Sequence, residues 1–146
     1  MISENNNNEI QIQQLITNWT NALCLKDINQ MMSNYADDVI IFDIKPPFQT
    51  KGAIEWRRMW EKCLPYFPES FQIETRDIII HVSDNIAFAH WLWRFTEVPE
   101  NHRILKTWMR ATMGYRKQNE QWLIVHEHAS LPFNPETSQV VFTSDP

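Results

Sequence analysis

The apolar residues in the first part of the chain recur with the period of an α-helix. Between residues 10 and 23 they are spaced three and four apart, which predicts an amphipathic helix that buries one face. Asp27 offers an N-cap, and Gln30 stands three residues later, as in a capping box. The sequence therefore predicts a second, short helix that runs on through Tyr35.

A short strand and a third helix complete the first half of the chain. The apolar run at residues 39–43 predicts a brief strand, which Pro46 and Pro47 end because proline has no amide hydrogen to donate to a sheet. Residues 50–64 return to helical spacing and stop before Pro65. Three helices, with one short strand among them, are therefore expected before the strands begin.

The second half of the chain alternates apolar and polar residues with a period of two. Short polar segments divide it into four strand-like stretches, at residues 71–82, 86–96, 103–117 and 121–130. Connections this short join antiparallel neighbours. The pattern predicts the α+β class, with three N-terminal helices packed on one side of a curved antiparallel sheet. Because such long strands generally bend, the sheet is expected to wrap its helices into a cone.

The two ends of the chain fall outside this pattern. Residues 1–9 are a polar tract that predicts a disordered N-terminal tail, and residues 134–146 have the turn-rich composition of a C-terminal tail. Residues 10–133 are then expected to form one domain, in keeping with a length of 146 residues.

The strand at residues 121–130 has one unusual face. With regular alternation, that face mixes large apolar side chains with polar ones: Trp122, Ile124, His126, His128 and Ser130. The opposite face carries Leu123, Val125, Glu127 and Ala129. A face that is purely core has no need of imidazole groups, so we expect the face with the histidines to line a small-molecule cavity.

Composition and charge argue against several function classes. The net charge of −5 and the scattered basic residues argue against nucleic acid as a partner. No apolar run reaches the roughly 18 residues of a membrane span, and the N-terminus lacks the positive and apolar regions of a signal peptide. Cys24 and Cys63 have no metal-binding spacing and are expected to be reduced thiols of a cytoplasmic protein.

Seven tryptophans stand against only two glycines. Trp19, Trp56 and Trp60 lie on the apolar faces of their predicted helices, where they form either plain core or the wall of a cavity for a flat, hydrophobic ligand. Trp91 and Trp93 are expected to point outward. They would then support a homodimer through the outer face of the sheet, because aromatic side chains are enriched at such interfaces.

Two segments resemble the nuclear-transport-factor-2-like superfamily, and within it the SnoaL-like and ketosteroid-isomerase-like proteins. They are DINQMMSNYADDVIIFD at residues 27–43 and RATMGYRKQNEQWLIVHEHASLPF at residues 110–133. The second is also similar to the last hairpin of the calcium/calmodulin-dependent kinase association domain. The resemblance covers roughly residues 10–133. It implies a cystatin-like cone whose open end binds a small molecule without metal or cofactor, in a protein that is commonly a dimer.

An ungapped match to ketosteroid isomerase keeps one catalytic position and loses two. The match places Asp43 on the family's general base, Trp19 on its oxyanion tyrosine and Ala111 on its protonated aspartate. A tryptophan N–H can donate one hydrogen bond, whereas alanine offers none. Classical ketosteroid isomerase activity is therefore not expected.

Asp43 is the first candidate catalytic residue. At the end of an apolar strand, and with the resemblance to a general base, it can move protons in a cavity whose apolar walls raise its pKa. The alternative is that it caps the turn before the proline-rich loop, a common use of aspartate.

Three histidines are the next candidates. His126 and His128 lie two apart on one strand and point the same way, which suits proton transfer or hydrogen bonding in the cavity. With His90 and Asp43 they supply ligand types suited to zinc or iron, but the spacing is only permissive and no metal is expected. Satisfied structural histidines are the remaining alternative.

His90 and Arg94 fall on the same face of their predicted strand, and the strand register of the resembled family would turn that face inward. A buried Arg94 could bind a carboxylated ligand through two parallel hydrogen bonds, unless the strand frays and leaves the guanidinium solvated. Met113 is expected inside together with Ala111. A single bulge would exchange the faces and bring Arg110 inside instead.

These residues predict an apolar pocket that contains Asp43 and the histidines. The first hypothesis is an isomerase, cyclase or hydratase in which Asp43 moves a proton on a hydrophobic carbonyl substrate, with His126 or His128 as the partner acid. The alternative is a non-catalytic module that binds a small hydrophobic or carboxylated molecule, or an oligomerisation module. Retention of Asp43 favours catalysis, whereas loss of both oxyanion donors favours binding.

Overall fold

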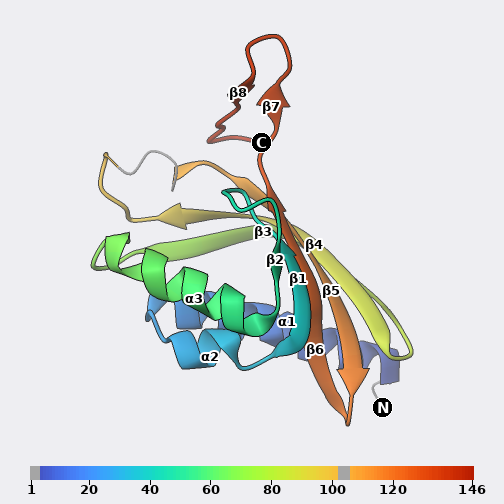
Figure 1. The fold of residues 1–146 in the computed structure, drawn as a ribbon. Helices are drawn as coiled ribbons and strands as arrows, with labels where there is room; N and C mark the ends of the chain where they lie inside the picture. Colours follow the sequence, from blue (N-terminus) through green and yellow to red (C-terminus); the bar gives the residue numbers. More distant parts are fainter. Residues whose placement is uncertain (1–3, 102–105) are drawn as a thin grey trace.

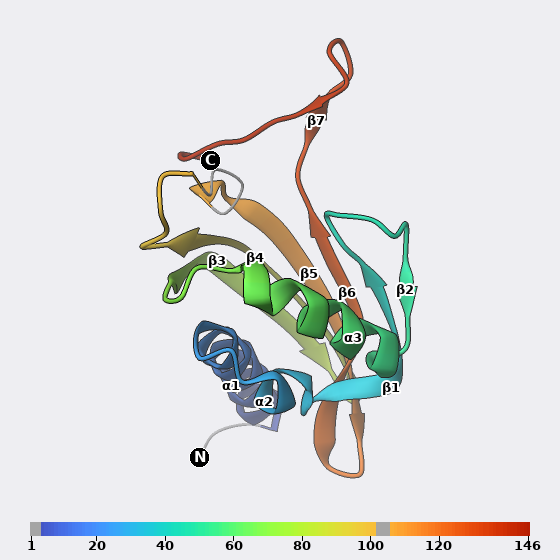
Figure 2. The ribbon, with the colours of Figure 1, turned by 60° about the vertical axis from the view of Figure 1, so that its left-hand side comes forward.

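Helices cover one side of a single curved sheet in the computed structural model, which describes residues 4–101 and 106–146 (Figure 1). The helical segments are α1 (Glu4–Cys24), α2 (Ile28–Met32), α3 (Ala53–Cys63) and the 3-10 turn η1 (Leu64–Tyr66). Figure 2 shows the three α-helices gathered on the same side of the sheet. The predicted α+β arrangement is present, with one long helix, one very short helix and one of intermediate length.

The strands form one six-stranded sheet and a small separate hairpin. The sheet contains β1 (Tyr35–Phe42), β2 (Thr50–Lys51), β3 (Gln72–Ser83), β4 (Ile86–Thr96), β5 (Met109–Gln118) and β6 (Gln121–Ser130), in the order β2-β1-β6-β5-β4-β3. β7 (Phe133–Asn134) and β8 (Gln139–Val140) form a hairpin that projects from the body (Figure 1). The strand predicted at residues 103–117 falls partly outside the described residues and is found from Met109 onward.

The sheet is mixed rather than wholly antiparallel. β3, β4, β5 and β6 are antiparallel neighbours, as their short connections predicted. β1 instead runs parallel to β6, with Ile40 opposite His126 and Phe42 opposite His128. The prediction of an antiparallel sheet is wrong for this pair, because strands so far apart in the sequence are not constrained by a hairpin.

The N-terminal helix begins earlier than the composition predicted. α1 starts at Glu4, within the polar tract, and Asn8 is buried against the sheet. The Asn8 Oδ1 atom accepts hydrogen bonds from Lys117 Nζ at 3.1 Å and from Trp122 Nε1 at 3.3 Å. The expectation of disorder is therefore wrong for residues 4–9, because these contacts with distant residues hold a turn whose local composition is polar.

The core lies between the helices and the concave face of the sheet. Ile12 and Leu23 of α1, Trp56 of α3 and Tyr115 of β5 are almost inaccessible to solvent. The predicted N-cap of α2 is confirmed, since the Asp27 side chain accepts a hydrogen bond from the Gln30 amide. No helix of the described chain is both long enough and apolar enough to cross a membrane.

An extra residue interrupts the pairing of β6 with β5. Tyr115 lies opposite Ile124, and Gly114 lies opposite His126. Val125 therefore has no partner of its own and forms a β-bulge. A bulge of this kind shifts the alternation of side chains by one residue, so that the faces exchange beyond it.

The bulge decides which polar side chains of β6 enter the interior. Trp122 is buried before the bulge, as regular alternation predicted, but beyond it Glu127 and Ala129 are the buried residues. His126 is only half-buried and His128 is exposed. The predicted histidine-bearing inner face is therefore wrong for this half of the strand, and a carboxylate enters instead of two imidazoles.

Candidate functional site

A cavity of about 210 Å³ lies between α1, α3 and the concave face of the sheet. Its wall is mainly aromatic, formed by Trp19, Trp56, Trp60, Phe67, Trp93 and Phe95. The remaining lining residues are Asp43, Ile44, Lys45, Met59, Cys63, Met109, Glu127 and Ala129. Two carboxylates, Asp43 and Glu127, thus face a space that is otherwise largely apolar.

The tryptophans predicted as a cavity wall lie together. The ring centroid of Trp19 is 5.9 Å from that of Trp60 and 6.3 Å from that of Trp93, in edge-to-face contacts. Trp56 packs on Trp60 in the same way at 5.8 Å. Trp93 faces this cluster and Trp91 is buried, so the prediction that both point outward is wrong.

The indole N–H groups of the cavity wall lack hydrogen-bond partners. Four Nε1 atoms are buried and have no hydrogen-bond partner among residues 4–101 and 106–146, those of Trp19, Trp56, Trp60 and Trp93. The Trp56 indole does lie beside the Tyr35 hydroxyl, close enough to lower the pKa of Tyr35, but outside hydrogen-bonding geometry. Buried donors without partners are rare in folded proteins. A ligand that carries acceptor oxygens would satisfy them.

Asp43 lies at the edge of the cavity, one residue beyond β1. Its Oδ1 atom accepts the backbone N–H of Ile44 at 2.8 Å, and its Oδ2 atom lies 3.4 Å from Lys45 Nζ. The side chain is 19% exposed. Asp43 therefore caps the turn and lines the cavity at the same time, and its role in proton transfer stays a prediction.

Glu127 is the site residue that the sequence did not reveal. Its carboxylate is buried, and the Tyr35 hydroxyl donates a 2.5 Å hydrogen bond to Oε1. Burial raises the pKa of Glu127 to about 7, the Tyr35 hydrogen bond opposes that rise, and the charge of Asp43 adds to it. Burial and the Glu127 charge also raise the pKa of Tyr35 well above its ordinary value, so Tyr35 remains a donor.

The three candidate histidines lie on the outer face of the sheet, away from the cavity. The Nδ1 atom of His126 is 2.8 Å from the carbonyl oxygen of Ile40, and both His126 and His128 pack against Phe42. His90 is exposed and stacks on His81 with ring centroids 6.2 Å apart. Across residues 4–101 and 106–146, no three His, Cys, Asp or Glu side chains are placed to share a metal ion.

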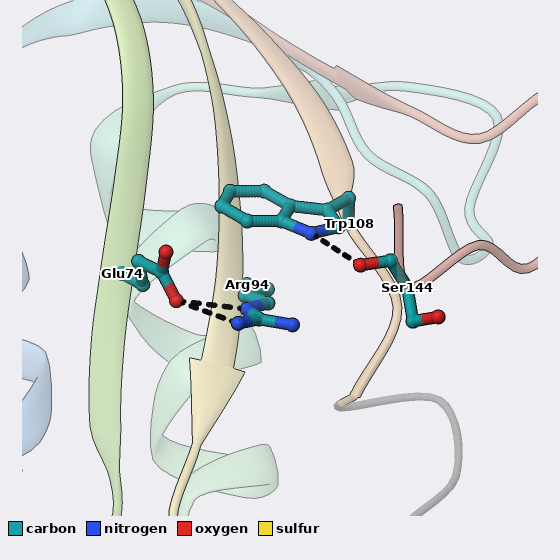
Figure 3. Close-up of polar contacts among 4 residues, drawn as sticks. All are labelled: Glu74, Arg94, Trp108 and Ser144. Carbon is teal, nitrogen blue, oxygen red and sulfur yellow. Dashed lines mark hydrogen bonds and ion pairs between the residues drawn. The ribbon is translucent and has the colours of Figure 1, made fainter. Parts of the chain in front are cut away.

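Arg94 also lies outside the cavity. Its guanidinium binds Glu74 Oε2 through Nε at 2.9 Å and Nη2 at 2.8 Å, and it stacks 4.8 Å from the centroid of the Trp108 ring. The Trp108 indole in turn donates to the carbonyl oxygen of Ser144 at 3.1 Å (Figure 3). Glu74 supplies the partner that a ligand carboxylate was expected to supply, and the C-terminal residues pack on the same cluster.

Met113 and Arg110 settle the faces of β5. Ala111 and Met113 are buried, and Met113 accepts the Tyr115 hydroxyl at 3.7 Å without lining the cavity. Arg110 is exposed on the outer face and donates to Ser130 Oγ at 3.0 Å. Met113 is therefore a core residue beneath the site, and Arg110 does not enter it.

Comparison with known proteins identifies the family. The sequence profile of the SnoaL-like domain matches residues 12–134. A crystal structure of an NTF2-like protein of unknown function from Pseudomonas putida is similar over 94% of this chain and 96% of that one, with 36% identity and a TM-score of 0.86. None of the curated proteins compared with the chain matches it.

More distant structures share the fold alone. One is a proposed dehydratase of the NTF2-like family from Streptomyces avermitilis, with 16% identity, a TM-score of 0.71 and coverage of 86% of this chain and 97% of that one. Another is a proposed ketosteroid isomerase from Parabacteroides distasonis, with 21% identity, a TM-score of 0.64 and coverage of 82% and 83%. The chain therefore belongs to the SnoaL-like domain family and has the NTF2-like fold.

Proposed function

We propose that the chain is a cofactor-independent enzyme that moves a proton on a small apolar carbonyl compound. The observation that carries this proposal is the pair of carboxylates, Asp43 and Glu127, in one aromatic cavity. Two carboxyl groups whose environments differ can divide the roles of base and acid between them. Glu127 replaces His126 and His128 as the partner acid of the earlier hypothesis.

Asp43 is the proposed general base and Glu127 the proposed general acid. Because the pKa of Glu127 is about 7, a substantial fraction of it carries a proton at neutral pH. Its Oε1 atom accepts from Tyr35, which leaves Oε2 to hold that proton. Asp43 lies at the end of β1, where it can take a proton from the carbon next to a carbonyl group.

The proposed step is balanced by these two groups. Asp43 removes the proton, and the electron pair moves onto the carbonyl oxygen. As the carbonyl bond re-forms, that pair passes to a conjugated carbon, which takes the proton of Glu127 in an isomerisation, or expels a hydroxyl group from the β-carbon, which takes this proton and leaves as water. Exchange with solvent then removes the proton from Asp43 and returns one to Glu127. The unpaired Trp19 indole N–H is the proposed donor to the carbonyl oxygen, at the position where the resemblance places an oxyanion tyrosine.

The size of the cavity limits the substrate. A volume of about 210 Å³ is below the roughly 300–1,000 Å³ of pockets for drug-sized ligands. A molecule of one or two rings fits this limit better than a steroid does. The similar folds of a proposed dehydratase and a proposed isomerase support this reaction class.

The test uses 2-tetralone and 1-indanone as probes. Exchange of the protons next to their carbonyl groups in D₂O is followed by proton NMR. We expect the wild type to accelerate exchange and Asp43→Asn to lose about 100-fold or more of that acceleration, the usual contribution of a general base. Equal rates with and without protein would contradict the proposal.

The alternative is a binding module without catalysis. Here the probes would bind, as seen by calorimetry, but the exchange rate would be the same for wild type and Asp43→Asn. The four unpaired indole N–H groups are compatible with this outcome, because they need only a ligand with acceptor oxygens.

We also propose a homodimer through the outer face of the sheet, but on different residues from those predicted. Trp91 and Trp93 face inward, whereas Ile79, Ile86 and Phe88 leave apolar surface exposed on that face. Light scattering of Phe88→Asp beside the wild type tests this. A wild type that is already monomeric at micromolar concentration would contradict it.

A further inference from the structure

We infer that the substrate is an amphipathic anion, whose apolar part occupies the aromatic cavity and whose negative group binds in an adjoining cationic groove. The inference rests on the proposed function of the cavity and adds the class of substrate. Its structural basis is a second hollow, of about 580 Å³, between α3 and the loop that leads into β2.

Four cationic side chains from two segments converge on this groove. Lys45 and Lys51 come from the loop and β2, and Arg58 and Lys62 come from α3. The one acidic residue that lines the groove is Glu55, which pairs with Arg58. The groove therefore carries a local excess of positive charge in a chain whose net charge is −5.

Two of these cations have no ion-pair partner in the described chain. Lys45 lies 3.4 Å from Asp43 and Arg58 pairs with Glu55, but Lys51 and Lys62 pair with none of the described acidic residues. Lysines along a helix usually form a solvated face. This cluster differs because side chains from separate segments surround one concave space, and concave sites focus the field of like charges on a ligand.

The groove and the cavity share a border. Lys45, Met59 and Cys63 line both spaces. A ligand that occupies both spaces would pass between these three side chains. Its anionic end would then lie near Lys51 and Lys62, which line the groove but not the cavity, and away from Asp43 and Glu127, which line the cavity but not the groove.

Among the described residues that line the cavity itself, Lys45 is the one cation. Arg94, the cation expected to hold a ligand carboxylate, is engaged by Glu74 on the far side of β4. The cavity itself presents Asp43 and the partly ionised Glu127, whose negative charges would repel an anion. An anionic group attached to the substrate is thus excluded from the cavity and attracted to the groove, which would fix the orientation of the carbonyl end.

Calorimetry with matched probes tests the inference. The probes are 2-naphthylacetate, its neutral amide 2-naphthylacetamide, and 2-naphthyl phosphate. We expect both anions to bind the wild type about tenfold more tightly than the amide, with an advantage that falls as salt is raised. The stronger of the two anions tells whether the groove prefers carboxylate or phosphate.

The variant Lys51→Gln/Lys62→Gln separates the groove from the cavity. It should lose about five- to tenfold in affinity for the anions and leave amide binding unchanged. Arg110→Gln/Arg116→Gln, which removes two charges from the outer face of β5, is the matched control and should bind every probe like the wild type.

Each other outcome counts against the inference. If anions and amide bind equally, or if the control variant loses as much affinity as the groove variant, the groove does not recognise an anion. If no probe binds, the ligand class is wrong. Failure of the proposed function is seen separately, because proton exchange and its loss in Asp43→Asn are measured with neutral ketones that do not need the groove.

Discussion

Buried tryptophan N–H groups are hydrogen-bonded at one end of the concave face and unpaired at the other. Near the β5–β6 turn, the Trp122 indole donates to Asn8, which also accepts from Lys117. At the other end, beside α3, four indole N–H groups border the cavity and have no partner in the part of the chain that the structure describes. The indole N–H is therefore hydrogen-bonded at the end without a cavity and unpaired at the end that forms the cavity.

The difference separates structural residues from site residues. A buried polar group without a partner costs about 1–3 kcal/mol, so several at one place lower the stability of the fold there. Functional sites are where such a loss is commonly tolerated. By this criterion the tryptophans around Asp43 and Glu127 belong to the site, and Trp122 belongs to the scaffold.

The strongest test of the comparison is Glu127→Gln. This change keeps the shape of the side chain and its contact with Tyr35 but removes the acidic proton. We expect the dehydration of 4-hydroxy-4-phenyl-2-butanone, a β-hydroxy ketone whose departing hydroxyl takes the proton of Glu127, to slow about 100-fold. Asn8→Ala, at the other end of the sheet, should leave the dehydration rate of the folded protein unchanged. Equal losses in the two variants would remove the distinction between the ends.

The stability of the protein should depend on Glu127 in a defined pH window. Its folded-state pKa of about 7 is above the ordinary value of 4.5. As pH rises between these values, the unfolded chain releases the proton first, so stability falls by about 3 kcal/mol and then levels off above pH 7. Urea unfolding at pH 5 and pH 8 should show this fall in the wild type but not in Glu127→Gln. Parallel changes in both proteins would contradict the assignment.

The end of the sheet near the β5–β6 turn should lose stability when its acceptor, Asn8, is removed. Asn8→Ala leaves the buried Trp122 N–H without its acceptor and removes one of the two partners of the Lys117 ammonium, the other being Glu120. We expect a loss of about 2 kcal/mol in the free energy of unfolding. Asn7→Ala, on the exposed side of α1, is the control and should be neutral or slightly stabilising because alanine favours helix. A neutral Asn8→Ala would mean that the polar cluster does not hold α1.

A smaller effect should separate two matched substitutions of tryptophan. Trp122→Phe gives up a hydrogen bond, whereas Trp60→Phe removes a donor that has no partner. The first is expected to lose about 1 kcal/mol more stability than the second. Thermal unfolding of both variants measures the difference. A larger loss for Trp60→Phe would show that the indoles of the cavity are already satisfied.

The smallest effect is expected from the outer face. His126→Gln and His128→Gln should leave the rate of proton exchange at the wild-type level, since neither side chain lines the cavity. A tenfold loss in either variant would show that an imidazole reaches the substrate, and would return these residues to the site.

The elements of the fold could be predicted because they follow local rules. The spacing of apolar residues marked α1, α3 and the four long strands, and Asp27 marked the start of α2. The residues of the resemblance indicated the family and placed Asp43 and Trp19 near one another. These signals lie within short stretches of sequence, where periodicity and capping act.

The inner face of β6 could not be predicted in the same way. Val125 is an ordinary strand residue, and nothing in its neighbours marks it as a bulge, which arises from how β6 pairs with β5. One unpaired residue moved Glu127 inward and His126 and His128 outward. The inner face of β4 was also predicted wrongly. Trp91 and Trp93 point inward because burial of these large apolar rings outweighs burial of His90 and Arg94.

The parallel pairing of β1 with β6 has a consequence for how the protein is made. Tyr35 and Glu127 are separated by 92 residues, so at about 5–20 residues per second a ribosome needs roughly 5–20 s to pass from one to the other. During that interval the nascent helices have no central strand to cover their apolar faces. The acid of the proposed reaction is thus among the last parts of the protein to acquire its surroundings, and the unfinished chain is most in need of a chaperone just before the site exists.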